Sequence, residues 1–128
     1  MSRFENTNQL LVGILEAAGR RVLTNRTGSN LAQGITGCLI EAADWGGRID
    51  ADLAVFEIDE AAVRRLAPRL RPRLVVVTNL ARDQLDRFGE LATTASHIAE
   101  ALQHAGTAVL NADDDSYRYL RPILADRH

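Results

Sequence analysis

The pattern of apolar and polar positions changes most sharply within residues 74–90, LVVVTNLARDQLDRFGE. Four apolar residues, 74–77, three of them β-branched, run directly into Thr78-Asn79 and a stretch rich in charged and amide side chains. This pattern predicts a buried strand that enters a polar loop. Ligands of parallel α/β sheets bind beyond the carboxyl ends of the strands, so the loop is a candidate site. The turn and cap residues that any such loop needs explain its polarity equally well.

Three other apolar runs predict strands, at residues 21–25, 53–58 and 107–110. Helical spacing of apolar residues predicts helices between them. We expect these at residues 8–18, closed by Gly19; 30–43, capped by the turn 27–30; 60–66; 91–104; and after 111–115. In the first of these helices, one face carries Leu10, Leu11, Ile14 and Leu15. The helix over 91–104 has the clearest apolar stripe, formed by Leu91, Ala95, Ile98, Ala99 and Leu102.

Prolines and glycines divide these elements further. Pro68 and Pro72 should bracket the connection into the strand 74–77, and Pro122 should end or bend the last helix. Gly34 and Gly37 weaken the helix over 30–43, because each costs up to about 1 kcal/mol relative to alanine. We therefore expect another backbone or a ligand to come close at both glycines.

Strands alternate with helices along the whole chain, and the connections are long enough for parallel pairing. The first three strands are nearly all apolar, as strands covered on both faces should be. The sequence predicts one α/β domain over residues 1–128, with three layers and a mainly parallel, Rossmann-like sheet.

Composition narrows the possible functions. The chain has 128 residues, is 46% hydrophobic and has a formal net charge of -2. Its fifteen arginines are interleaved with seventeen acidic residues, so we expect no surface of one sign, no nucleic-acid partner and no general binding to anionic membranes. There is no lysine, which excludes Schiff-base chemistry and a phosphate-binding loop completed by a lysine of this chain.

The cysteine count and the length of the apolar runs predict where in the cell the protein is found. The single cysteine, Cys38, cannot form an internal disulfide and is expected to be a small core residue. No signal peptide opens the chain, and no apolar run approaches the roughly 20 residues that span a bilayer. We therefore expect a cytoplasmic protein without a transmembrane segment.

Every predicted strand is followed by amides, hydroxyls or carboxylates. A carboxylate such as Glu57 can hold Mg²⁺ through one or two oxygens while phosphate oxygens complete its coordination. A helix N-terminus such as that at Asn30 suits phosphate oxygens. These residue types are typical of a nucleotide and metal site, although capping requirements generate similar strand endings.

Four runs, in order and spacing, resemble the central ATPase domain of the Mur ligases: TNRTGSNLAQGI, VFEIDEAAV, RLVVVTNLARDQLDRFGEL and VLNADD. The resemblance covers about residues 7–120, and DQLDRFGEL after TNL is similar to the branch of that family that amidates lipid II. It implies an ATP-dependent ligase of cell-wall synthesis that activates a carboxylate as an acyl phosphate. In that branch a GatD-like glutamine amidotransferase supplies the ammonia that amidates the D-glutamate of lipid II.

The resemblance also implies roles for individual residues. Glu57 matches the Mg²⁺-binding glutamate of the family, and Asn30 resembles an asparagine near the γ-phosphate and metal. Gln84 lies where most members have a metal-binding histidine, and glutamine is typical of the lipid II-amidating branch. Three more residues match motifs at the nucleotide crevice, and no individual role is assigned to Asn79, Asn111 or Asp113.

The departures from the family are as specific as the matches. The family's nucleotide site begins with a strand and a GTNGKTTT-type loop, whereas FENTNQLL precedes the first predicted helix here. The family's C-terminal domain and the four-cysteine zinc ribbon of this branch have no counterpart in the 128 residues. We therefore expect a partial ligase domain, missing its first strand, that binds ATP and Mg²⁺ weakly or not at all and cannot turn over alone.

Two further expectations follow. A sheet without its first strand has an unpaired edge, which favours a homo-oligomer. The alternative function is a non-catalytic α/β interaction module derived from a Mur ligase, in which the polar strand ends are relics.

Overall fold

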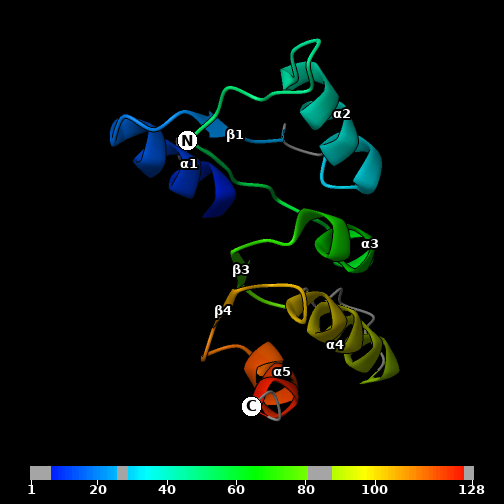
Figure 1. The fold of residues 1–128 in the computed structure, drawn as a ribbon. Coiled ribbons are helices and arrows are strands. Elements are labelled where there is room, and N and C mark those ends of the chain that lie inside the picture. Colours follow the sequence, from blue (N-terminus) through cyan, green and yellow to red (C-terminus); the bar gives the residue numbers. More distant parts are fainter. Residues whose placement is uncertain (1–6, 26–28, 81–87, 126–128) are drawn as a thin grey trace. The chain divides into compact units, whose positions relative to one another are not determined.

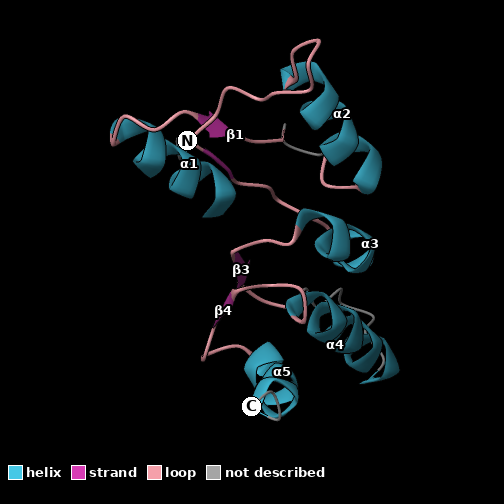
Figure 2. Cartoon of the chain, viewed as in Figure 1, coloured by secondary structure: helices cyan, strands magenta, loops and turns pink. Residues whose placement is uncertain are grey.

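The computed structural model describes residues 7–25, 29–80 and 88–125 (Figure 1). The chain forms two compact units, Met1–Asp59 (unit 1) and Glu60–His128 (unit 2). Helices and short strands alternate in both (Figure 2). The prediction of one domain over residues 1–128 stays a prediction.

Unit 1 contains a parallel pair of strands joined through a helix. Its elements, in order, are α1 (Thr7–Ala17), β1 (Val22–Leu23), α2 (Ala32–Ala42) and β2 (Leu53–Ala54). β1 pairs with β2 in parallel, with Val22 opposite Leu53, and the N–H of Val55 extends the ladder to the Leu23 carbonyl at 2.8 Å. The strands are shorter than the predicted 21–25 and 53–58, but the β-α-β connection is the expected one.

The first helix ends as predicted but turns a different face inward. Gly19 has a φ of +79°, the left-handed conformation that a C-capping glycine adopts. Its N–H donates to the Glu16 carbonyl at 2.9 Å. Val12 is the buried residue of α1, whereas Leu10 and Ile14 are exposed. The apolar stripe therefore identified the helix but not its packed face.

The start of α2 corrects two predictions. The N-cap position is Leu31, without a side-chain hydrogen bond, so the predicted capping by the turn 27–30 is wrong. A Cβ on Gly34 would lie 2.4 Å from the Ser29 carbonyl oxygen, which confirms the close approach of another backbone there. A Cβ on Gly37 would meet no protein atom within 4 Å, so the predicted approach of another backbone is wrong for Gly37, and the approach of a ligand stays a prediction.

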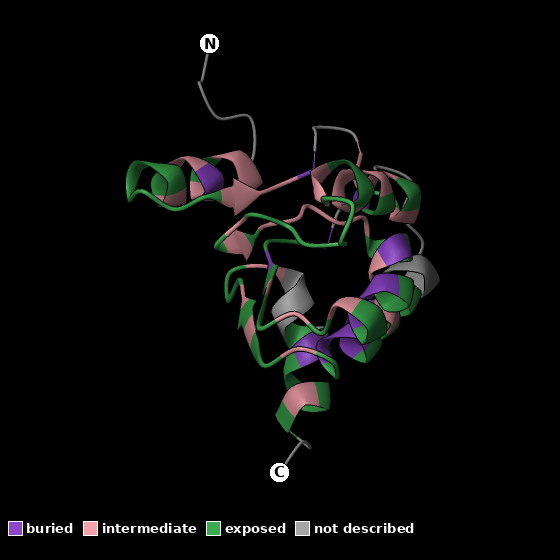
Figure 3. Ribbon diagram, turned by 45° about the horizontal axis from the view of Figure 1, so that its top comes forward, coloured by how far each residue is buried: buried purple, intermediate pink, exposed green. Residues whose placement is uncertain are grey.

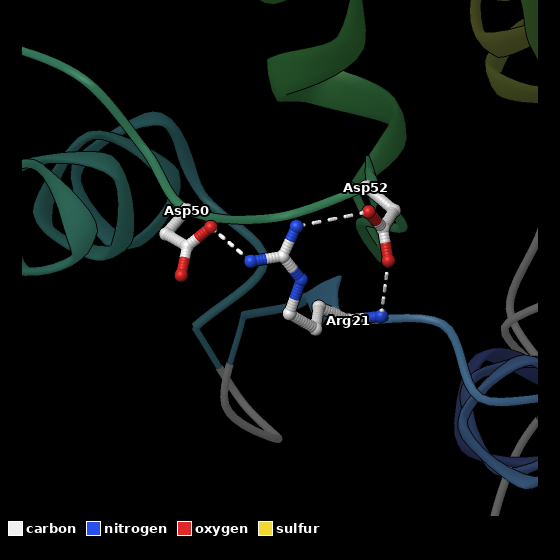
Figure 4. A network of polar contacts seen from close by, with 3 residues as sticks. All are labelled: Arg21, Asp50 and Asp52. Carbon is white, nitrogen blue, oxygen red and sulfur yellow. Dashed lines mark hydrogen bonds and ion pairs between the residues drawn. The ribbon is translucent and has the colours of Figure 1, made fainter.

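A charged network fixes the register of β1 against the segment before β2 (Figure 4). The Arg21 guanidinium pairs with Asp50 and, at 3.1 Å, with Asp52, while the Arg21 main-chain N–H donates to Asp52 at 2.8 Å. This backbone hydrogen bond and then the guanidinium hold the pKa of Asp52 below its ordinary value. The network is exposed and screened by solvent, so we assign it mainly to register, with a small contribution to stability.

Unit 2 contains a second parallel pair. Its elements are α3 (Glu60–Leu70), β3 (Leu74–Val77), α4 (Phe88–Leu102), β4 (Thr107–Leu110) and α5 (Asp115–Ala125). β3 and β4 pair in register from Leu74 opposite Thr107 to Val77 opposite Leu110, and both strands have the predicted bounds. Parallel strands alternating with helices confirm the α/β class.

The core of unit 2 joins β3, α4 and α5. Buried residues, purple in Figure 3, are concentrated in its helices, and α3 also packs on α4. Four of the five predicted stripe residues of α4 are buried; the side chain of Leu91 lies outside the described part. Leu74 and Val76 of β3 are exposed, so the expectation that this strand is covered on both faces is not met. The core cluster consists of Val77, Leu80, Ala95, Ile98, Ala99, Leu102 and Leu120.

Prolines end these helices less sharply than predicted. α3 continues through Pro68 to Leu70, and α5 continues through Pro122 to Ala125. A proline removes one main-chain donor. Buried Leu66 and Ala67 hold the last turns of α3, which ends where Arg71 takes a φ of 45°. Within the described ranges no helix is long and apolar enough to cross a membrane.

Candidate functional site

Asn25, directly after β1, is buried and uses its whole carboxamide to connect distant segments. The residue is 6% exposed, and among the residues whose burial is described it is the one buried polar residue. Nδ2 donates to the carbonyls of Ser29, at 2.9 Å, and Glu57, at 2.8 Å. Oδ1 accepts the N–H of Glu57 at 3.0 Å. Both N–H groups and the oxygen are therefore satisfied, as a buried amide requires.

This arrangement, called the Asn25 clamp below, brings together two of the predicted site residues. Both main-chain groups of Glu57, its N–H and its carbonyl, are hydrogen-bonded to the Asn25 side chain, and Glu57 is half-buried. The N–H of Asp59 donates to the Asn30 carbonyl at 3.0 Å, which joins the start of α2 to the same segment. Asn30 is also half-buried. Asn30 and Glu57 thus lie on two segments that main-chain and Asn25 hydrogen bonds connect directly.

Gly34 completes the clamp from the helix side. The Ser29 carbonyl that accepts from Asn25 lies where a side chain at position 34 would begin, 2.4 Å from an ideal Cβ. A glycine is therefore needed for the first turn of α2 to approach this carbonyl. The clamp depends on both Asn25 and Gly34, one on each side of Ser29.

The acidic residues near the clamp fit one kind of metal site and not another. Among the described residues there is no group of three or more His, Cys, Asp or Glu side chains that could enclose a metal ion. Mg²⁺ needs only one or two protein carboxylates when phosphate oxygens and water complete its octahedron. The half-buried carboxylate of Glu57 fits Mg²⁺ held together with a phosphate substrate, and it does not fit an all-protein cage.

In unit 2 the polar residues after β3 and β4 form a closed turn. Asn111 Nδ2 donates to the Thr78 carbonyl at 3.0 Å, and Asn111 Oδ1 accepts the N–H of Asp113 at 3.0 Å. The Asp114 carboxylate accepts the N–H of Leu80 at 3.3 Å. Asn111 and Asp114 are therefore structural partners of the strand ends, as the capping alternative proposed.

The remaining predicted residues differ in their surroundings. Asn79 and Asp113 are exposed, and within the described ranges no hydrogen bond engages either side chain. Gln84 lies outside the described residues. Among the predicted site residues that the structure describes in unit 2, Asn79 and Asp113 can therefore contact a ligand without first breaking a hydrogen bond.

Sequence reasoning missed two features of the chain. Asn25 was only one of several polar strand ends, because its partner Glu57 is 32 residues away and no local spacing connects them. The run RRLAPRLRPR, residues 64–73, was overlooked because its five arginines were averaged into a net charge of -2. The run itself was a sufficient signal.

Comparison with known proteins defines the class. Residues 7–128 match the family described as Mur ligase middle domain, and the chain belongs to that family. It is 38% identical over 118 residues to the lipid II isoglutaminyl synthase (glutamine-hydrolyzing) subunit MurT of Streptococcus pneumoniae, covering 92% of this chain and 26% of that protein. It is also 38% identical over 109 residues to the MurT subunit of Staphylococcus aureus, covering 84% and 24%. The family resemblance of the sequence is confirmed, and the chain spans about a quarter of these relatives.

Proposed function

We propose that the chain is part of an ATP-dependent carboxylate-amine ligase of peptidoglycan synthesis, which amidates the D-glutamate of lipid II to D-isoglutamine. The observation that carries this proposal is the similarity, over 92% of the chain, to a protein named as a subunit of lipid II isoglutaminyl synthase. The Asn25 clamp supports it, because it joins the segments of Asn30 and Glu57.

The proposed reaction has two steps. An oxygen of the D-glutamate carboxylate attacks the γ-phosphorus of ATP, the bond from that phosphorus to the bridging oxygen breaks, and ADP leaves. Ammonia then attacks the acyl carbon, the carbon-oxygen bond to phosphate breaks, and the nitrogen loses a proton as the amide forms. The chain's own contribution is to bind and orient the phosphates, which is the main source of catalysis in phosphoryl transfer.

In unit 1 we assign the phosphate-facing roles to Glu57 and Asn30. The Glu57 carboxylate would hold Mg²⁺ together with phosphate oxygens, and the Asn30 carboxamide would contact the γ-phosphate. Bound Mg²⁺ supplies neutralisation of the charge that develops on the phosphate oxygens. The clamp contributes by fixing the main chain of Glu57, so that its carboxylate needs little reorganisation when ligands bind.

In unit 2 we assign nucleotide-contacting roles to the polar residues that follow the strands. Asn79 and Asp113 are exposed and suited to hydrogen bonds with ATP. Asn111 contributes by shaping the turn that presents Asp113, since its carboxamide is already engaged. The family resemblance alone supports a metal-binding role for Gln84, as a weak and neutral ligand.

Further polypeptide is part of the proposal. The chain contains no lysine, so a phosphate-binding lysine has to come from elsewhere. Ammonia would come from a GatD-like glutamine amidotransferase in the cytoplasm, and self-association of the chain stays a prediction. By itself the chain would bind ATP and Mg²⁺ weakly and would not turn over.

Reconstitution tests this function. The chain would be mixed with lipid II, ATP, glutamine and a GatD-like glutaminase, with and without polypeptide that carries a lysine-containing phosphate loop, and lipid II would be analysed by mass spectrometry. We expect conversion of the carboxyl to the amide only in the complete mixture. Amidation without the lysine-containing polypeptide would contradict the partial-site proposal. No amidation in any mixture would favour the non-catalytic interaction module.

A further inference from the structure

Five exposed arginines lie within ten residues of sequence, along α3 and just past its end. Three lie on the helix and two between the helix and β3. Residues 60–73 contain these five arginines and a single carboxylate, Glu60, a local formal charge of +4 in a chain whose net charge is -2. We call this the α3 arginine surface; its members are Arg64, Arg65, Arg69, Arg71 and Arg73.

The helix separates this surface from the core of unit 2. At 100° per residue, Arg64, Arg65 and Arg69 fall within an arc of about 140° on one side of α3. The other side carries Leu66 and Ala67, which are buried. The arginines are therefore held on one face because the opposite face is anchored in the core.

Interactions among the described residues do not account for these charges. In the described part of the chain, both ion pairs use Arg21, and neither involves the α3 arginine surface. The negative end of a helix favours a cation in its last turn, which explains Arg69 alone. Arg64 and Arg65 lie earlier in the helix, and Arg71 and Arg73 lie past its end. Five guanidinium groups in ten residues, with no ion-pair partner among the described residues, point to an anionic partner.

We propose that the α3 arginine surface docks on the anionic phospholipid headgroups of a bilayer. Guanidinium groups bind phosphate oxygens well, and an anionic leaflet attracts a nearby basic segment by about fivefold in affinity per cation. The inference rests on the proposed function, because the substrate named for the relatives, lipid II, is itself a lipid and would be met at a bilayer surface. Docking would hold the ligase where its substrate is concentrated.

Vesicle sedimentation tests the docking. The chain would be spun with vesicles of phosphatidylcholine alone and with vesicles of equal parts phosphatidylcholine and phosphatidylglycerol, without lipid II or ATP. We expect binding to the anionic vesicles only. It should weaken strongly as salt rises from 0.1 M to 1 M, because the screening length falls from about 10 Å to about 3 Å.

Two triple variants with equal charge show whether the surface is responsible. The first, called the cluster variant, replaces three arginines of the surface and should bind anionic vesicles about 100-fold more weakly, because each lost cation lowers the affinity about fivefold. The control variant removes three exposed arginines outside the surface and should stay within a few-fold of the wild type. Both change the net charge from -2 to -5. The cluster variant is Arg64→Gln, Arg65→Gln and Arg69→Gln, and the control is Arg20→Gln, Arg48→Gln and Arg118→Gln.

Several results would overturn the proposal. These are equal losses in the two triple variants, equal binding to neutral vesicles, or tighter binding to duplex DNA than to anionic vesicles at the same phosphate concentration. If circular dichroism shows that the cluster variant does not fold, a second variant with lysine at the same three positions tests the docking instead. The lysines keep the charge and should keep vesicle binding within a few-fold, and loss of binding in that variant would refute a mainly electrostatic docking.

Failure of this inference can be told apart from failure of the proposed function. Vesicle binding without amidation in the complete reconstitution leaves the docking surface and rejects the ligase. Amidation of lipid II in detergent, together with no binding to anionic vesicles, leaves the ligase and rejects the docking surface.

Discussion

Replacing Asn25 with aspartate tests the clamp with almost no change in side-chain volume. Asparagine donates two hydrogen bonds here, to the carbonyls of Ser29 and Glu57, and accepts one from the Glu57 N–H. An ionised aspartate keeps the accepting oxygen and loses both donors. It also places a negative charge beside two carbonyl oxygens in a site where the native residue is 6% exposed. We therefore expect Asn25→Asp to destabilise unit 1.

The magnitude follows from the two lost donors. Leaving a fully buried carbonyl without its partner costs about 1–3 kcal/mol, and because the Ser29 and Glu57 carbonyls are only part-buried, the lower end applies, about 2 kcal/mol for the two at neutral pH. Burial and the facing carbonyls should raise the pKa of the introduced aspartate above its ordinary value of about 3.9. Because its folded pKa exceeds its unfolded pKa, the loss should be smallest below about pH 4 and should grow as pH rises through the folded pKa.

Urea unfolding with residue-level hydrogen exchange measures this effect. Exchange at the Glu57 amide, which donates to Asn25, reports on the clamp, whereas the fluorescence of exposed Trp45 is a poor reporter. Asn111→Asp is the matched control, because Asn111 also donates to a carbonyl, that of Thr78, but is exposed. The control should cost under about 1 kcal/mol. Equal losses in the two variants, or a loss under about 1 kcal/mol for Asn25→Asp, would refute the reasoning.

Two further predictions concern the same unit. Gly34→Ala should lower the free energy of unfolding by about 1–3 kcal/mol, because its Cβ meets the Ser29 carbonyl at 2.4 Å, while Gly37→Ala should raise it by up to about 1 kcal/mol; equal shifts in calorimetric melting temperature would contradict this. Arg21 lowers the pKa of Asp52, so this stabilisation is present above the ordinary aspartate pKa of about 3.9 and is lost as pH falls through the lower folded pKa. Arg21→Gln removes the guanidinium but keeps the main-chain N–H, which lowers this pKa most, so it should flatten the dependence of stability on pH only in part; complete flattening in that acidic window would contradict the assignment.

Sequence patterns located the elements best where local chemistry decided them. The bounds of β3 and β4 were predicted to the residue, because short apolar strands change abruptly into polar turns at Thr78 and Asn111. The stripe of α4 was confirmed by the burial of Ala95, Ile98, Ala99 and Leu102. In these segments the residues that pack and the residues that end the element are neighbours in sequence.

Prediction failed where tertiary contacts decided. The rule that proline ends a helix gave 60–66 for α3, but burial of Leu66 and Ala67 outweighs one missing N–H near the helix end. The α2 cap was placed at residues 27–30, whereas the Asn30 carbonyl is engaged by Asp59 and Leu31 takes the cap position. The spacing of residues in the sequence does not reveal such tertiary contacts.

The candidate site also has parts that the sequence predicted and parts that it did not. Residue types at the strand ends, together with the family resemblance, singled out Glu57 and Asn30, and the structure places them on directly connected segments. The clamp that connects them could not be predicted, because its hydrogen bonds span 32 residues. The arginine run could have been found by scanning charge locally.

The central claim is that Glu57 and Asn30 form part of a Mg-ATP site that other polypeptide completes. NMR of the labelled chain titrated with Mn²⁺ and ATP tests it, because paramagnetic Mn²⁺ broadens nearby amides even when binding is weak. We predict broadening at residues 29–30 and 57–59. Binding of the nucleotide should be more than about a thousandfold weaker than micromolar, because the chain has no lysine to supply the charge-assisted hydrogen bonds to phosphate.

Glu57→Gln should abolish this broadening and keep the fold, because the clamp holds the main chain of residue 57, which glutamine retains. Glu60→Gln, which removes an exposed carboxylate three residues away, should leave the broadening unchanged. Micromolar binding by the chain alone, or broadening that survives Glu57→Gln, would contradict the account.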